Sequence, residues 1–112
     1  MLIEFPRGDY KSCSITITGF EGTIEELYFT VKKKASDSEY VLQKHIGDGI
    51  EYSSEIEKYV LKFEPEDTDN LEMNTIYGCD FEIYAEHGNF KKTFTGQLHL
   101  TSEYTHTGNE VE

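Results

Sequence analysis

Alternation of apolar and polar side chains with a period of two is the feature that most restricts the fold of this chain. In FKKTFTGQLHLT, residues 90–101, the large apolar side chains occupy even positions and every odd position is polar. This period places one side of an extended strand in a core and the other in solvent. YGCDFEIYAE, residues 77–86, repeats the pattern. The intervening EHGN contains Gly88 and Asn89, which suit positive φ, and therefore predicts a hairpin.

Further alternating segments predict that strands make up most of the chain. The additional expected strands are residues 2–5, 12–18, 26–34, 39–46 and 58–64. Turn-forming residues separate them, including GDGIEYSSE at 47–55, which we interpret as a connection. No window carries the apolar stripe of a helix. The spacing predicts an all-β protein, an immunoglobulin-like antiparallel β-sandwich of about six to eight strands. We expect one domain over residues 1–102 and a flexible acidic tail over 103–112.

The inward positions of these strands define the expected core. Two of them are cysteines, Cys13 and Cys79, which predict buried reduced thiols rather than zinc ligands or a disulfide framework. A bond between them would require the two strands to be neighbours. The expected core residues are Ile15, Ile17, Leu27, Phe29, Val31, Leu61, Phe63, Phe81, Ile83, Phe94 and Leu98.

The charge of the chain restricts its partners. Acidic residues number 22 and basic residues 10, which gives a formal net charge of −12. Such a surface repels phosphate and anionic lipid, so we expect no nucleic-acid or membrane partner. Residues 64–112 carry 11 acids and 2 bases, a balance of −9, and favour a basic partner, although solubility also explains these acids. Glu4 and Asp9 interrupt the N-terminus and no apolar run exceeds three residues, so we expect neither a signal peptide nor a transmembrane segment.

The densest acidic stretch is FEPEDTDNLE, residues 63–72, which holds five carboxylates. A calcium site would use three of them as ligands: Glu64, Asp67 and Asp69. The stretch lacks the alternating ligands, central glycine and closing glutamate of a helix-loop-helix calcium site. Pro65 can begin a helical turn that Asp67 or Thr68 caps, with Leu71 packed beneath it. We therefore interpret the segment as a structural corner and expect no metal ion or cofactor.

Residues that could carry catalysis are scattered. The four histidines lie far apart, and neither a nucleophile elbow nor a glycine-rich phosphate loop occurs. Asp80 and Glu82 lie on one solvated strand face, which is ordinary spacing for a strand and weak evidence for a glycosidase. We expect the protein not to be an enzyme.

Two groups of residues are candidates for contacts with another protein. The first is the only basic cluster, Lys32, Lys33 and Lys34, at the end of an expected strand; such lysines either blunt a strand edge or contact an acidic subunit. The second is a pair of tyrosines, Tyr28 and Tyr84, at outward positions. Exposed tyrosine either fills a sheet face or anchors an interface. Tyrosine-rich faces also bind sugars, but the chain has no tryptophan.

The order of several motifs resembles a known group of proteins. LYFTVKKK at 27–34 is followed by LQKHIGDGI at 42–50, YVLKFEPEDTDNL at 59–71 and YGCDFEIYAEHGNFKKTFTGQLHL at 77–100. The third motif contains an Asp-Thr-x-x-Leu turn and the fourth a Tyr-x-x-Asp-x-Glu-Ile strand. This order resembles small β-sandwich domains of tailed-phage and prophage virion proteins, including the N-terminal domain of baseplate upper proteins. The chain departs from them in lacking a long fibre-forming or receptor-binding region, so the resemblance implies a stand-alone structural module without catalytic residues.

These observations lead to three expectations about function. The first is a non-enzymatic structural or adaptor protein, a phage or prophage tail or baseplate component that binds other virion subunits or further copies of itself through edge strands. Its expected location is the bacterial cytoplasm during assembly and then the virion. The second is a carbohydrate or small-ligand binding module that uses exposed tyrosines. The third is an acidic inhibitor or nucleic-acid mimic that binds a basic protein.

Overall fold

A computed structural model of the chain describes residues 1–19 and 23–102. Its eight strands form a single mixed sheet in the order β1-β8-β7-β3-β4-β5-β6-β2. The strands are β1 (Leu2–Pro6), β2 (Lys11–Ile15), β3 (Ile24–Lys32), β4 (Leu42–Ile46), β5 (Gly49–Ser53), β6 (Lys58–Phe63), β7 (Thr75–Ala85) and β8 (Phe90–Thr101). Two short helical segments, α1 (Pro65–Thr68) and the 3₁₀ turn η1 (Glu86–Gly88), complete the described elements.

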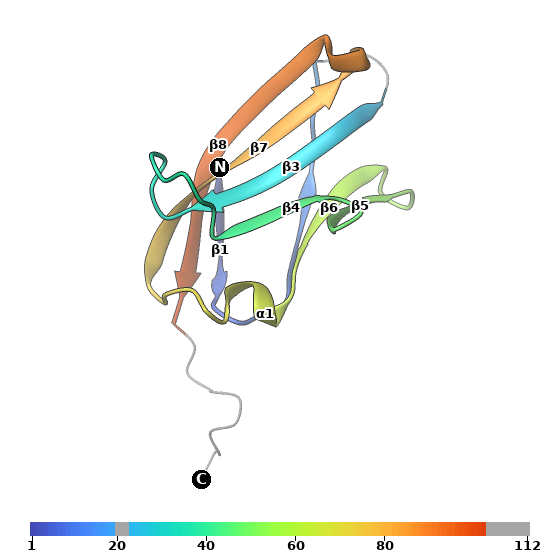
Figure 1. The fold of residues 1–112 in the computed structure, drawn as a ribbon. Helices are drawn as coiled ribbons and strands as arrows, with labels where there is room; N and C mark the ends of the chain where they lie inside the picture. The colour runs from blue at the N-terminus through green and yellow to red at the C-terminus, as the bar shows by residue number, and fades with distance from the viewer. Residues whose placement is uncertain (20–22, 103–112) are drawn as a thin grey trace.

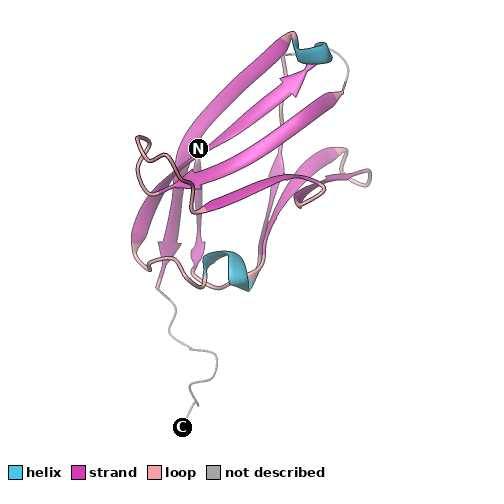
Figure 2. Cartoon of the chain, viewed as in Figure 1, coloured by secondary structure: helices cyan, strands magenta, loops and turns pink. Residues whose placement is uncertain are grey.

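The sheet is curled so that its two ends approach each other. Figure 1 shows β8, β7, β3 and β4 as one wall and β5, β6 and β2 as the facing wall, so the shape is nearly that of a barrel. The two helical segments lie at opposite ends of this structure, α1 at the lower end and η1 at the upper end (Figure 2). The space between the walls holds the core.

The prediction of an all-β protein is confirmed, and the strand count falls within the expected range. Five of the seven strand pairings are antiparallel, as expected, and the other two are parallel. β1 runs parallel to β8, with Leu2 opposite Gln97, and β4 makes a short parallel contact with β5, with His45 opposite Gly49. Alternation reveals which side of a strand is buried but not which strand lies beside it, so sequence alone missed both pairs. The immunoglobulin-like arrangement of two separate sheets stays a prediction.

Residues 47–55, which were expected to be a connection, contain β5. Gly47 and Gly49 both have positive φ, 92° and 91°, and turn the chain sharply between β4 and β5. Such angles suit glycine because it has no Cβ. The chain then pairs with β6 and buries Ile50 completely. The turn residues therefore form a corner only two or three residues long.

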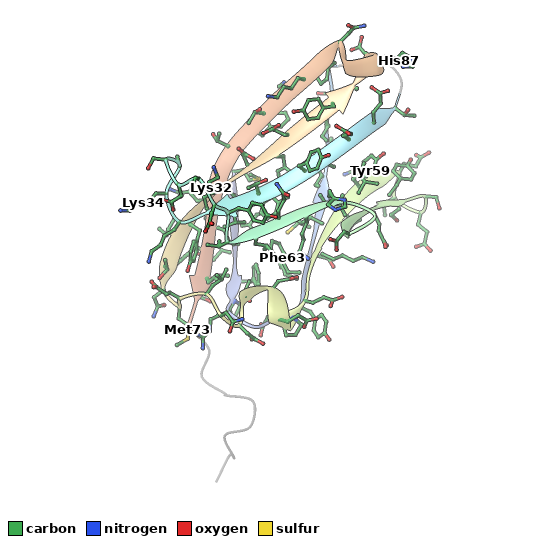
Figure 3. The ribbon with its side chains drawn as sticks, viewed as in Figure 1. Lys32, Lys34, Tyr59, Phe63, Met73 and His87 are labelled. Carbon is green, nitrogen blue, oxygen red and sulfur yellow. The ribbon has the colours of Figure 1, made fainter. Side chains whose placement is uncertain are left out.

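An aromatic cluster joins strands from both walls. The Phe63 ring lies 4.9 Å from the Phe5 ring and 5.7 Å from the Phe29 ring, and the Phe29 ring lies 4.9 Å from the Phe81 ring. Figure 3 places Phe63 between the walls, above α1. Of the expected core, eight residues are buried: Leu27, Phe29, Val31, Leu61, Phe63, Phe81, Ile83 and Leu98. The other three, Ile15, Ile17 and Phe94, are partly buried and pack against the core.

Both cysteines are free, and burial raises the pKa of each thiol, that of Cys79 to about 11. Cys79 is buried, as expected, whereas Cys13 is only half-buried. The predicted hairpin joins β7 to β8. Gly88 has the expected positive φ of 84°, but Asn89 does not, with φ of −82°. The predicted tail at 103–112 lies outside the described residues, as do residues 20–22 of GFEGT, a stretch with two glycines that we interpret from the sequence as a turn after the expected strand at 12–18.

Candidate functional site

The outer side of the larger wall carries a row of rings. Tyr28 on β3 meets Tyr84 on β7 edge-on, with ring centroids 6.4 Å apart and an angle of 87° between the planes. On its other side Tyr28 lies 6.1 Å from the His45 ring on β4. These contacts follow from the register, which sets Tyr28 opposite both Glu82 and His45. We call the outward residues Tyr28, His45, Asp80, Glu82, Tyr84 and Lys91 the outer tyrosine face.

Charged groups hold Tyr84 in place on this face. The Tyr84 hydroxyl donates a hydrogen bond of 2.8 Å to Glu82 Oε1, and this bond raises the pKa of the phenol. Lys91 on β8 lies with Nζ 5.8 Å from the Tyr84 ring centre and 3.8 Å from Glu82 Oε1. A cation over an aromatic ring and beside a carboxylate is thus already present on the face.

Asp80 lies one row further along β7, opposite Thr30 of β3. No ion pair to Asp80 occurs among the described residues. Burial, and then the neighbouring Glu82, raise the pKa of this carboxyl, and Lys32 and Lys91 only partly offset them. Glu82 has a lysine at ion-pair distance whereas Asp80 does not, so Asp80 is an acceptor available to a cation from outside.

A shallow hollow of about 270 Å³ lies beside Asp80. Gly78 is on the outward side of β7, opposite Lys32 and Gln97, and contributes no side chain there. The residues around the hollow are Thr30, Lys32, Ala35, Gly78, Cys79, Asp80, Thr95 and Gly96. The space has the size of a single side chain with water, and its polar lining consists of two threonines, the Asp80 carboxylate and Lys32.

The side chains of Lys32 and Lys33 have partners within the chain, whereas the contact of Lys34 is made by its backbone amide. Lys32 Nζ donates to the Asp37 carbonyl oxygen at 2.9 Å, and Lys33 Nζ lies 3.4 Å from Glu72 Oε1 on the surface. The Lys34 amide donates to Asp37 Oδ2 at 3.1 Å. Figure 3 shows Lys32 and Lys34 beside the loop that follows β3. These contacts organise the loop, and only Lys32 borders the hollow next to the outer tyrosine face.

The acidic segment closes the lower end of the curled sheet. Pro65 begins α1, as predicted, and the Glu64 amide donates to Asp67 Oδ2 at 2.7 Å. The same oxygen lies 2.8 Å from Nζ of Lys44, a lysine of β4 whose side chain is 9% exposed. Thr68 is fully buried and accepts a 2.7 Å hydrogen bond from the Gly8 amide. The segment thus connects the two walls, and Asp67 is already occupied by a cation.

The burial of the Lys44 charge was not predicted from the sequence. The sequence does contain a signal for this burial, because Lys44 alternates with Leu42 and Ile46 and so lies on the apolar side of its strand. The Lys44–Asp67 pair differs from the surface ion pairs of this protein because both of its side chains are largely buried. A buried lysine without a carboxylate beside it would be strongly unfavourable.

A larger cavity lies away from the outer tyrosine face. It measures about 500 Å³ and is bounded by residues of β2, β3, β5 and β6 and by neighbouring loop residues. The Tyr52 and Tyr59 rings meet nearly edge-on within it, 5.2 Å apart. Its lining is Ile15, Thr16, Ile17, Thr23, Ile24, Tyr52, Glu57, Lys58 and Tyr59. Tyr52 lies in the segment that was expected to be a connection, so this tyrosine pair was not predicted from the sequence.

The described residues show neither a metal cluster nor a membrane-spanning helix. Among residues 1–19 and 23–102, no three His, Cys, Asp or Glu side chains are placed to share a metal ion. In the same part of the chain, no helix is long and apolar enough to cross a membrane. Comparison with other proteins gave no match to a protein-family model, a curated protein or a solved structure. These comparisons therefore contribute nothing to the functional interpretation.

Proposed function

We propose that the protein is a non-enzymatic adaptor or structural subunit that binds a protein partner through the outer tyrosine face. The observation that carries the proposal is the pair of mutually packed tyrosines beside an acid, Asp80, with no ion-pair partner among the described residues. Tyrosines fixed on a sheet lose little conformational freedom on binding and supply both apolar and hydrogen-bonding area. Ring contacts on both sides of Tyr28 hold it ready for such a role.

The partner that fits this face presents an arginine or a lysine. Lys91 illustrates the contact within the chain, since it lies over Tyr84 and next to Glu82. An arginine from a partner would repeat this arrangement over Tyr28, with its guanidinium directed to Asp80 and the adjoining hollow. The net charge of −12 would also speed the approach of a basic partner.

Binding of a fluorescent, arginine-rich peptide tests this proposal. We expect the variant with Tyr28→Ala and Tyr84→Ala to bind at least about tenfold more weakly than the unsubstituted protein, because buried tyrosines dominate many interfaces. Tyr40→Ala is the matched control, since Tyr40 is exposed and lies outside the face. Equal affinities for all three proteins, with folding verified by circular dichroism, would count against the proposal.

The setting that the resemblance implies is part of the proposal. A tail or baseplate subunit of a phage or prophage would use such a face to join a neighbouring subunit. The nearly closed sheet is also compatible with a distorted immunoglobulin-like sandwich whose two walls remain connected through the β4–β5 corner. Neighbouring genes that encode capsid or tail proteins would favour this setting, whereas a metabolic operon would contradict it.

A second candidate function is binding of a carbohydrate or another small ligand in the larger cavity. The specific observation is the Tyr52–Tyr59 pair in a space of about 500 Å³, which lies within the usual range for ligand pockets. Saturation-transfer NMR with a panel of mono- and oligosaccharides tests it. A signal that disappears in Tyr52→Ala would favour the ligand-binding function, and no signal from any sugar would count against the carbohydrate version.

A further inference from the structure

The two edge strands of the sheet differ in how well they are protected against pairing with another chain. β1 and β2 are the first and last strands in the sheet order. β1 contains Glu4, which is paired with His99, and Pro6, which has no amide hydrogen to donate. Charge and proline are the usual features that prevent an edge from recruiting another strand. β1 therefore carries ordinary edge protection.

β2 begins with Lys11, but beyond that lysine neither the strand nor the residues after it carry such protection. Residues 12–18, SCSITIT, include neither a charged residue nor a proline, in a chain where 29% of residues are charged. Four successive residues of this stretch, from Ile15 to Thr18, are β-branched and favour extended backbone. Among the described strands, β2 pairs with β6 alone, from Lys11 opposite Phe63 to Ile15 opposite Tyr59. Its other edge therefore forms no backbone pairing with another described strand, although the curl of the sheet brings β1 toward it.

The side chains of this edge are already sorted into two rows. The polar row is exposed and consists of Ser12, Ser14, Thr16 and Thr18. The apolar row is only half-buried and consists of Cys13, Ile15 and Ile17. A strand added here would cover the apolar row further and would satisfy backbone groups, which are the two gains that favour strand addition.

We propose that this edge pairs with the same edge of a second copy of the chain, antiparallel and about a two-fold axis at Ile15. In that register each apolar residue meets an apolar residue and each polar residue meets a polar one. The facing pairs are Ile15 with Ile15, Cys13 with Ile17, Ser14 with Thr16, and Ser12 with Thr18. No charged residue opposes another within the seven pairs, so the strand is complementary to itself.

The rest of the chain offers no better occupant. Residues 103–112 follow β8 and contain three acids, with only Tyr104 and Val111 as large apolar residues. They lack the alternating apolar side chains that would cover the inner row of β2. The β2 edge belongs to the wall opposite the outer tyrosine face (Figure 1), so pairing there leaves that face free.

Light scattering coupled to size-exclusion chromatography tests the dimer. One strand pair buries far less area than a standard interface, so we expect weak association and a measurement between about 10 µM and 1 mM protein. We expect the apparent mass to rise toward twice 12.9 kDa with concentration. Added salt should favour the dimer, because it screens repulsion between two copies that each carry −12. Ser14→Lys should remain monomeric throughout, whereas the matched control Ser36→Lys, in an exposed loop, should dimerise normally. A monomer at every concentration, or a dimer unaffected by Ser14→Lys, would overturn the proposal.

A cross-link provides a second measurement that does not depend on Ser14→Lys folding. Residues that face each other across an antiparallel pair have Cα atoms about 4.5–5.5 Å apart, which suits a disulfide. In a Cys13→Ser background, Ile15→Cys should therefore form a disulfide-linked dimer on mild oxidation, while Ser36→Cys should not. Equal cross-linking of the two variants, or none at position 15, would contradict the proposed register.

Discussion

Removal of the buried Lys44–Asp67 pair provides a quantitative test of the structure. Lys44 Nζ lies 2.8 Å from Asp67 Oδ2, and the two side chains are 9% and 17% exposed. The perturbation is Lys44→Met, which keeps an unbranched side chain of similar length but removes the charge. It leaves Asp67 partly buried without its cation, although the Glu64 amide still donates to it at 2.7 Å.

The expected cost follows from the burial of the pair. Removal of one partner from a buried ion pair costs about 3–5 kcal/mol. The remaining exposure of Asp67 and its retained hydrogen bond reduce this, so we expect Lys44→Met to lower the free energy of unfolding by about 2–4 kcal/mol. Addition of Asp67→Asn to Lys44→Met should then cost little, so a double-mutant cycle should give a coupling of about 2 kcal/mol.

Urea denaturation followed by far-ultraviolet circular dichroism measures these free energies, and the coupling should persist in 1 M salt because the pair is shielded from solvent. The matched control is Lys33→Met with Glu72→Gln, since that lysine and glutamate are 3.4 Å apart but 58% and 64% exposed. Their coupling should stay below about 0.5 kcal/mol. Equal couplings for the two pairs would refute the conclusion that Lys44 and Asp67 hold the lower end of the sheet closed.

Four further predictions address the core, the corner, the outer tyrosine face and the acidic segment. Phe81→Ala should cost about 3–5 kcal/mol in urea denaturation, and an unchanged midpoint would contradict its burial. Gly49→Ala should cost about 1–3 kcal/mol, because φ is 91° and the new Cβ would lie 2.5 Å from Lys44 Cδ. Asp80→Asn should stabilise the protein at neutral pH, because the raised pKa of the Asp80 carboxyl means that its ionisation is unfavourable in the folded state. Melting temperatures should show this gain disappear as the pH falls below 3.8, the ordinary pKa of the carboxyl. A gain that persists at lower pH would contradict this cause. The melting temperature should be the same with calcium as with a chelator. A rise that saturates at micromolar calcium and disappears in Asp67→Asn would reveal a site in residues 64–72.

Much of the strand content follows from alternation alone. β7 and β8 have the longest regular patterns, and their inward residues, such as Phe81 and Leu98, are buried as predicted. β5 was missed because glycine and serine surround it and only Ile50 carries a clear core signal. The parallel pairing of β1 with β8 depends on contacts between the two ends of the chain, which a local pattern does not encode.

The candidate site was predictable only in part. Alternation placed Tyr28 and Tyr84 on outward sides, but their contact depends on the register between β3 and β7, in which Glu26 faces Tyr84 and Tyr28 faces Glu82. The lysine cluster looked like one surface because its members are adjacent in sequence. In an extended chain adjacent side chains point to opposite sides, so Lys32 and Lys33 contact different partners.

Chemical-shift mapping of the isotope-labelled protein with an unlabelled arginine-rich peptide tests most directly whether the outer tyrosine face is the binding surface. We predict that the largest shifts fall on the strand residues around Tyr28, Asp80 and Tyr84, and that they shrink in Asp80→Asn. An acidic peptide of the same length should cause none. The five carboxylates of residues 64–72 form the denser acidic stretch, so attraction by charge alone would place the shifts there. Shifts centred on residues 64–72, or spread evenly over the surface, would contradict the proposed function.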